Sequence, residues 1–161
     1  MKGFSRIALA TLLCLAVPFV AVHAAAAKSG GAKPVPKKAV TLTPDQLKWV
    51  PNPDAPGAMT AAAWGDPDKG PHGAFHKFPA GFTAPLHTHS ADLRIVVISG
   101  TMAMAGEDGK ETELPVGSYL YQPNTYKHVT KCKEGSECVA FVMANGKFDI
   151  KTVGEKKATP K

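Results

Sequence analysis

From Met59 onward the chain consists of short apolar or alternating runs that are separated by clusters of glycine, proline, asparagine and aspartate. Runs of this length, with turn residues between them, predict strands and not helices. The expected strands cover residues 59–64, 73–78, 82–87, 93–99, 101–105, 111–114, 118–122, 126–132, 138–143 and 148–153. Asn145-Gly146 is typical of a hairpin turn before the last strand. The sequence therefore predicts an all-β domain.

The run Ile95-Val96-Val97-Ile98 is apolar at every position and is followed closely by Gly100. This pattern is typical of a strand that is buried on both faces. One face would fill the core, and the other face needs a cover. Either a second copy of the chain, giving a homodimer, or the segment around Trp49 can supply that cover.

The segment Thr43-Pro44-Asp45-Gln46 carries the signals of a helix start. Thr43 suits the N-cap, Pro44 the first helical position, and Gln46 the third, where its side chain can close a capping box. Three prolines follow at positions 51, 53 and 56, so the helix must be short. We expect this short N-terminal helix to rest against the β domain through Leu47 and Trp49.

Residues 1–24 have the layout of a secretory signal peptide, with a basic start, an apolar run and small residues before a cleavage point after Ala24. The apolar run is shorter than the roughly 20 residues that a membrane-spanning helix needs. We therefore expect a periplasmic or secreted protein that is free of the membrane once the signal is removed. Residues 25–40 are predicted to form a disordered linker, residues 41–153 the domain, and residues 154–161 a polar tail.

The formal net charge of +6 falls to +4 when Lys2 and Arg6 leave with the signal peptide. The remaining lysines are spread along the chain and form no basic stripe with interleaved aromatic residues. This distribution argues against nucleic acid as a partner.

His87 and His89 are two residues apart next to a predicted strand, so their side chains project to the same side. His128 follows a second strand and turn, in the stretch that begins at Gly117. Three neutral imidazoles suit a divalent transition metal such as iron, zinc, manganese or nickel, and they leave coordination positions for water or substrate. The alternative is three pocket histidines that bind no metal.

The two stretches resemble the signature motifs of the cupin superfamily. Gly81, His87, His89 and Gly100 match the first motif, and Gly117, Pro123 and His128 match the second. Leu93 stands where the first motif has its metal-binding glutamate, and Thr125 and Cys132 stand where the second has glycine and asparagine. The chain also resembles a group of exported cupin-like proteins of uncharacterised function and the cupin module of zinc-binding anti-sigma factors. The resemblance implies a jelly-roll β-barrel with a divalent metal in its mouth.

Other polar residues near these motifs have two interpretations each. Asp92 is the nearest acid that can complete the metal shell, or it is a solvated loop residue. His72 lies in a Gly-Pro turn and is expected to be solvated, whereas His76 is expected in the wall of the domain, with a position in the pocket as the alternative. Arg94 is either a paired strand residue or an anion anchor in the pocket.

Aromatic residues of the second motif are expected in the core, with pocket walls as the alternative interpretation. Tyr119 and Tyr121 share one face of the strand that leads into the motif, and Tyr126 lies near His128.

Cys132 and Cys138 are separated by a short polar loop that contains Gly135. In an exported protein such a pair is expected to form a disulfide across a hairpin. The alternative is that Cys132, four residues after His128, reaches the metal as a thiolate. Cys14 would leave with the signal peptide.

Three functions are compatible with these features. The first is a metal-dependent enzyme acting on a small molecule, such as a dioxygenase, isomerase or lyase; the second is a non-catalytic module that binds metal or ligand; the third is a purely structural barrel. The sequence favours a metal-binding cupin with a small-molecule ligand and leaves its catalytic status undecided.

Overall fold

The computed structural model describes residues 38–154, and within this range the chain forms two antiparallel sheets. The predicted signal peptide, most of the predicted linker and nearly all of the polar tail lie outside the described residues. The elements are η1 (Pro44–Gln46), β1 (Val50–Pro51), β2 (Met59–Gly65), β3 (His72–Phe78), β4 (His87–Thr88), β5 (Leu93–Ser99), β6 (Met102–Gly106), β7 (Glu111–Leu114), β8 (Tyr119–Gln122), β9 (His128–Cys132), β10 (Cys138–Ala144) and β11 (Lys151–Thr152).

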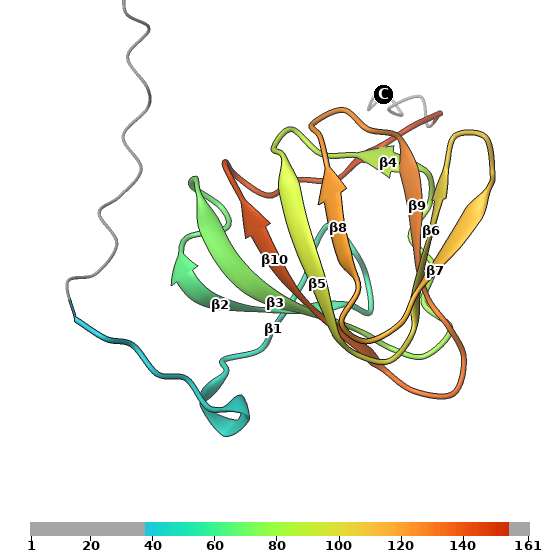
Figure 1. The fold of residues 1–161 in the computed structure, drawn as a ribbon. Helices are drawn as coiled ribbons and strands as arrows, with labels where there is room; N and C mark the ends of the chain where they lie inside the picture. The colour runs from blue at the N-terminus through green and yellow to red at the C-terminus, as the bar shows by residue number, and fades with distance from the viewer. Residues whose placement is uncertain (1–37, 155–161) are drawn as a thin grey trace, which may run out of the picture. The chain divides into compact units, whose positions relative to one another are not determined.

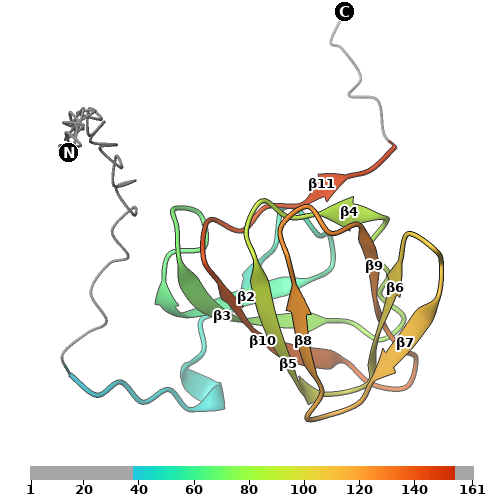
Figure 2. The same ribbon diagram turned by 45° about the horizontal axis from the view of Figure 1, so that its top comes forward.

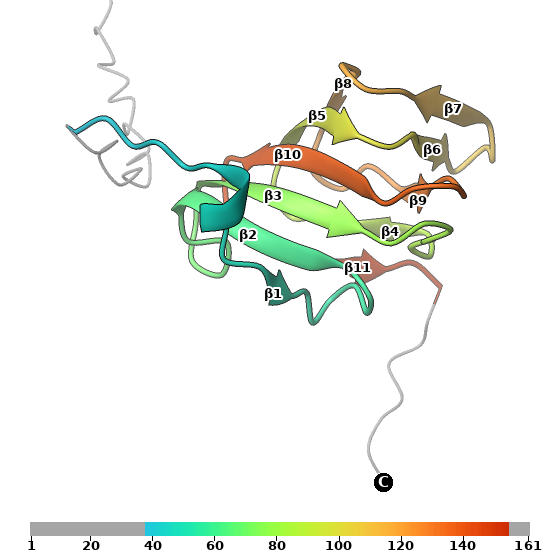
Figure 3. The same ribbon diagram turned by 90° about the horizontal axis from the view of Figure 1, so that it is seen from below.

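The first sheet has the strand order β1-β2-β3-β10-β5-β8, and the second has the order β11-β4-β9-β6-β7 (Figure 1). The two sheets face each other as a jelly roll, and the view from below separates them clearly (Figure 3). The prediction of an all-β domain is confirmed. No helix among the described residues is long and apolar enough to cross a membrane.

The core lies between the sheets and is lined by alternate residues of each strand. On β5, Leu93, Ile95 and Val97 are buried, whereas Arg94 and Ile98, which project to the opposite side, are exposed. The prediction that this strand is buried on both faces is therefore wrong: β-branched residues fill both sides, but only one side faces the opposite sheet. The outward side of β5 belongs to a sheet face that also carries exposed tyrosines on β8.

The predicted N-terminal helix is a single 3-10 turn with no buried residue. The backbone N–H of Thr43 donates to Oε1 of Gln46 at 2.9 Å, as a capping box requires. The turn ends at once, because Leu47 already has an extended backbone. Trp49, beyond the turn, contacts the domain through its ring, with Nζ of Lys77 lying 4.4 Å from the ring centroid.

The predicted strand 82–87 is reduced to β4, because Pro85 offers no N–H for a strand ladder. At the other end of the domain, Asn145-Gly146 does not form a hairpin. The chain instead leaves β10, crosses to the second sheet and adds β11 beside β4 (Figure 2). The side chain of Asn145 accepts a hydrogen bond from the backbone N–H of Asp92, so it joins the loop before β5.

Cys132 at the end of β9 and Cys138 at the start of β10 form a disulfide, as the sequence predicted. Gly100 packs against this bridge with a backbone φ of +72°, and a Cβ atom there would lie 2.9 Å from Cα of Cys138. Only glycine combines that conformation with that close approach. The disulfide thereby joins the two sheets at the end of the core.

Candidate metal centre

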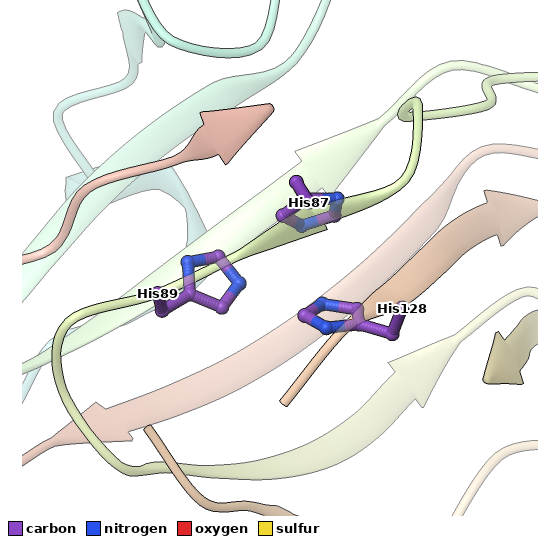
Figure 4. Close-up of side chains that lie close together, drawn as sticks. All are labelled: His87, His89 and His128. Atoms are coloured by element: carbon purple, nitrogen blue, oxygen red, sulfur yellow. The ribbon is translucent and has the colours of Figure 1, made fainter. Parts of the chain in front are cut away.

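Three imidazoles converge at one end of the space between the sheets (Figure 4). His87 lies on β4, His89 follows directly after it, and His128 opens β9. His87 and His128 are cross-strand partners in the β4–β9 ladder, which brings their ring centroids to 4.2 Å. One potential ligand atom from each of the three residues lies within 4.8 Å of the other two.

The second ring nitrogen of each histidine is held by a backbone carbonyl. Nδ1 of His87 lies 2.7 Å from the carbonyl oxygen of Pro85, and Nδ1 of His128 lies 2.9 Å from that of Tyr126. Nδ1 of His89 is hydrogen-bonded to the backbone carbonyl oxygen of Asp149. A carbonyl oxygen only accepts, so Nδ1 must carry the proton in all three rings. The lone pair of each neutral imidazole is therefore on Nε2, the arrangement that metal-ligating histidines use.

Burial keeps these imidazoles neutral. Removal from water lowers the pKa of His89 and of His128 to about 4, and it lowers the pKa of His87 as well. Neighbouring imidazoles lower the pKa of His89 and His128 further. At neutral pH a metal ion would thus bind without displacing protons from these nitrogens.

The site fits a transition metal by its donor set and by an unpaired atom. Nε2 of His128 is buried and has no hydrogen-bond partner among the described residues. Such an atom is costly to bury unless it gains a partner, and the three converging lone pairs repel one another without a cation. In a zinc site with Zn–N bonds of about 2.0–2.1 Å the nitrogens lie roughly 3.4 Å apart, so small side-chain movements would complete the coordination.

A cavity of about 50 Å³ lies beside His87 and His89. Its walls are almost entirely apolar, and none of the described residues that line it is an Asp, Glu, Lys or Arg. The polar groups in the wall come from Asn52, Thr130 and the histidines at positions 76, 87 and 89. Mostly apolar cavities with few polar groups are typical of small-molecule sites.

The segment between β10 and β11 closes one side of this site, which the sequence did not predict. The backbone carbonyl of Asp149 orients His89, and its carboxylate accepts hydrogen bonds from the backbone N–H and the hydroxyl of Ser90 at 2.7 and 2.8 Å. The ring of Phe148 lies 5.1 Å from that of His89, measured between centroids. These contacts span about 60 residues of chain, so no local sequence pattern could have indicated them.

Asp92 and Cys132 are not members of the group of converging ligand atoms. The carboxylate of Asp92 instead accepts hydrogen bonds from the backbone N–H of Asn124 at 2.8 Å and from the side chain of Asn145 at 3.1 Å. Cys132 is in the disulfide and has no thiolate to offer.

Predictions for the remaining residues have mixed outcomes. His72 is fully buried, not solvated, because it begins β3 between β2 and β10. Tyr119 is 59% exposed and Tyr121 46% exposed, so the expectation of core aromatics is wrong for both. Arg94 is exposed and lies over the ring of Tyr121, which excludes a role in the pocket. Tyr126 is 41% exposed, so the expectation of a core aromatic is wrong for it as well, and its ring stacks on His128 at 5.7 Å between ring centroids.

Comparisons with known proteins show which family model matches this chain and which solved structures share its fold. The profile of a family described as a domain of unknown function (DUF4437) matches residues 16–155. A comparison of the sequence with curated proteins found no match.

Several solved structures share the fold. The polyketide cyclase RemF from Streptomyces resistomycificus superposes with a TM-score of 0.63 at 18% identity, over 74% of this chain and 89% of that one. An RmlC-like cupin protein from Ralstonia eutropha gives 0.57 at 20% identity, over 70% and 72% of the two chains. A cupin-2 domain from Rhodospirillum rubrum gives 0.58 at 10% identity, over 75% and 84%. The chain therefore has the cupin fold that its two motifs predicted.

Proposed function

The chain belongs to the DUF4437 family, and within its cupin fold we propose that it binds one divalent metal ion through Nε2 of His87, His89 and His128. The observation that carries this proposal is the fixed tautomer of the three rings. Each Nδ1 donates a hydrogen bond to a backbone carbonyl, which leaves the lone pair of each ring on Nε2, and the potential ligand atoms of the three residues lie within 4.8 Å of one another. Iron, zinc, manganese and nickel all accept such a donor set.

We further propose that the bound ion holds a small molecule in the adjoining cavity. A divalent ion there would act as a Lewis acid on an oxygen atom of that molecule. Three neutral imidazoles leave the charge of the ion uncompensated, and Leu93, where the cupin motif has glutamate, adds no carboxylate. The apolar walls keep water away from the ligand and strengthen electrostatic interactions within the site.

The reaction class that this site supports best is a metal-assisted rearrangement, cyclisation or elimination of a small molecule. The polyketide cyclase among the structural neighbours is compatible with such chemistry on this fold. A second candidate is non-catalytic binding of metal and ligand. It is favoured by the composition of the cavity wall, where the described residues include no carboxylate to act as a general base.

The protein is proposed to work outside the cytoplasm. The signal-like residues 1–24 support export, and the disulfide between Cys132 and Cys138 is a bond that persists in oxidising compartments. A homodimer through the outward face of β5 is a further proposal, supported by the exposed Ile98 and Tyr119 on that face.

Elemental analysis and thermal unfolding of the full chain, purified after export, test the metal proposal. We expect one metal ion per chain and a rise in Tm of about 10 °C when the ion is present at 100 times its Kd. His87→Ala, His89→Ala and His128→Ala should each lose the ion and the rise in Tm.

The matched control is His72→Asn, which alters an equally buried histidine but keeps a donor for the carbonyl of Gly70. This variant should retain the metal. If the three triad variants keep a stoichiometric ion, or if the unmodified protein binds none under aerobic or anaerobic loading, the metal proposal is wrong.

A further inference from the structure

His76 projects from β3 into the space between the sheets, and only 3% of its surface is exposed. Its Nε2 atom is buried and lacks a hydrogen-bond partner within the part of the chain that the structure describes. The cross-strand neighbours are Thr60 on β2 and Ala140 on β10. An unpaired buried nitrogen destabilises the fold, whereas an apolar side chain of similar size would not. Among the described residues Nε2 of His72 lacks a partner in the same way, but His76, unlike His72, also lines a cavity from which a bound molecule can supply one.

The cavity beside the histidine triad is where such a partner can enter. His76 lines this cavity together with His87 and His89. At about 50 Å³ the cavity accommodates a few water molecules or a small organic fragment. A molecule bound at the triad would thus share a confined space with His76.

His76 nevertheless does not belong to the triad. It is outside the group of converging ligand atoms, and the ring of Phe148 contacts both His76 and His89, with centroid distances of 4.9 and 5.1 Å. A ligand that reaches both the triad and His76 must therefore extend past Phe148. This requirement sets a minimum of two polar groups on the ligand, with an apolar part between them.

The charges in the cavity wall indicate which kind of polar group the ligand would place next to His76. Burial, helped by the nearby His72 and His89, lowers the pKa of His76 to about 3, so its ring is neutral. A neutral imidazole presents one N–H and one lone pair, which suit a hydroxyl, carbonyl or amide. No Lys or Arg lies among the described residues of the wall to balance a carboxylate at this end of the ligand.

We infer that His76 is a ligand-contacting residue that hydrogen-bonds a neutral polar group of a small, mostly apolar molecule whose metal-binding oxygen lies at the triad. The inference rests on the proposed metal function. It assigns His76 a role in affinity for the ligand and none in affinity for the metal.

The test compares unmodified protein, His76→Phe and His76→Gln, each loaded with Co²⁺. The probe is 3-hydroxypropanohydroxamate, a small chelator whose two metal-binding oxygens are separated from a terminal hydroxyl by two methylene groups. Elemental analysis gives the metal content, and calorimetric titration gives the Kd of the probe. His72→Asn serves as the control, because His72 is equally buried on β3 and is not in the cavity wall.

We expect all four proteins to hold one Co²⁺, and we expect His76→Phe to raise the Kd of the probe by about 3- to 10-fold, the effect of one lost hydrogen bond. His76→Gln should restore most of the affinity, and His72→Asn should not change it. An unchanged Kd in His76→Phe with full metal would overturn the inference and leave the metal proposal intact. Loss of Co²⁺ in His76→Phe would also overturn it, since His76 would then support the metal site. Absence of metal in the unmodified protein would overturn both proposals.

Discussion

The buried histidines predict that the metal-free protein loses stability in mild acid. The pKa values of His76, His89 and His128 are lowered to about 3, 4 and 4, whereas an imidazole in the unfolded chain titrates near 6.5. Between these values the unfolded chain binds more protons than the folded protein does. The free energy of unfolding must therefore fall as the pH drops below 6.5.

The size of the effect follows from the distance to the unfolded pKa. A pH of 5 lies about 1.5 units below the pKa of an imidazole in the unfolded chain, and each unit corresponds to about 1.4 kcal/mol. Each of the three residues therefore lowers the free energy of unfolding by about 2 kcal/mol at this pH. The total, about 6 kcal/mol, is comparable with the whole stability of a small domain. His87, whose pKa is also lowered, acts in the same direction.

Urea denaturation of protein treated with a chelator, at pH 8 and at pH 5, measures this difference. His76→Phe should reduce the difference between the two pH values by about 2 kcal/mol, whatever its effect on stability at either one. Bound metal should protect the triad, because it holds the imidazoles in the neutral form. An equal free energy of unfolding at both pH values, or a pH dependence in His76→Phe as large as in the unmodified protein, would refute the reasoning.

Two further predictions concern positions where the chain departs from the cupin motifs. Thr125 is exposed and has a left-handed backbone with φ of 64°, so Thr125→Gly should stabilise the protein by about 1 kcal/mol. A lowered midpoint of urea denaturation would contradict this expectation. Leu93 is buried in the cavity wall, so Leu93→Glu should tighten metal binding by about tenfold and should destabilise the metal-free protein. Calorimetric titration measures the affinity, and thermal unfolding measures the stability. An unchanged affinity would show that residue 93 does not reach the ion.

Turn residues along the chain determined much of the fold in advance. Strands β5 and β7 begin and end where the sequence predicts, because turn residues flank both of these strand-length runs. His87 and His89 share a side for the same local reason, which is the two-residue period of extended chain. Gly81 and Gly117 of the two motifs have a positive φ, a local backbone conformation that favours glycine.

Burial of individual side chains depended on which strands become neighbours. His72 follows a Gly-Pro pair and so resembles a turn residue, yet pairing of β3 with β2 and β10 encloses it completely. Tyr119 is an aromatic residue on a strand and was therefore expected in the core, but its side of β8 faces away from the second sheet. A strand pattern gives two faces and does not say which of them another sheet covers.

The metal site likewise depends partly on local sequence and partly on the tertiary structure. The sequence determined which imidazoles are available and that two of them point together. Only the tertiary structure decided that His128 stands opposite His87 in the β4–β9 ladder and that the carbonyl of Asp149 fixes His89. It also decided that His76 lines the same cavity as His87 and His89. These relations join residues that are tens of positions apart, and strand register and the path of the last segment, which no local pattern encodes, bring them together.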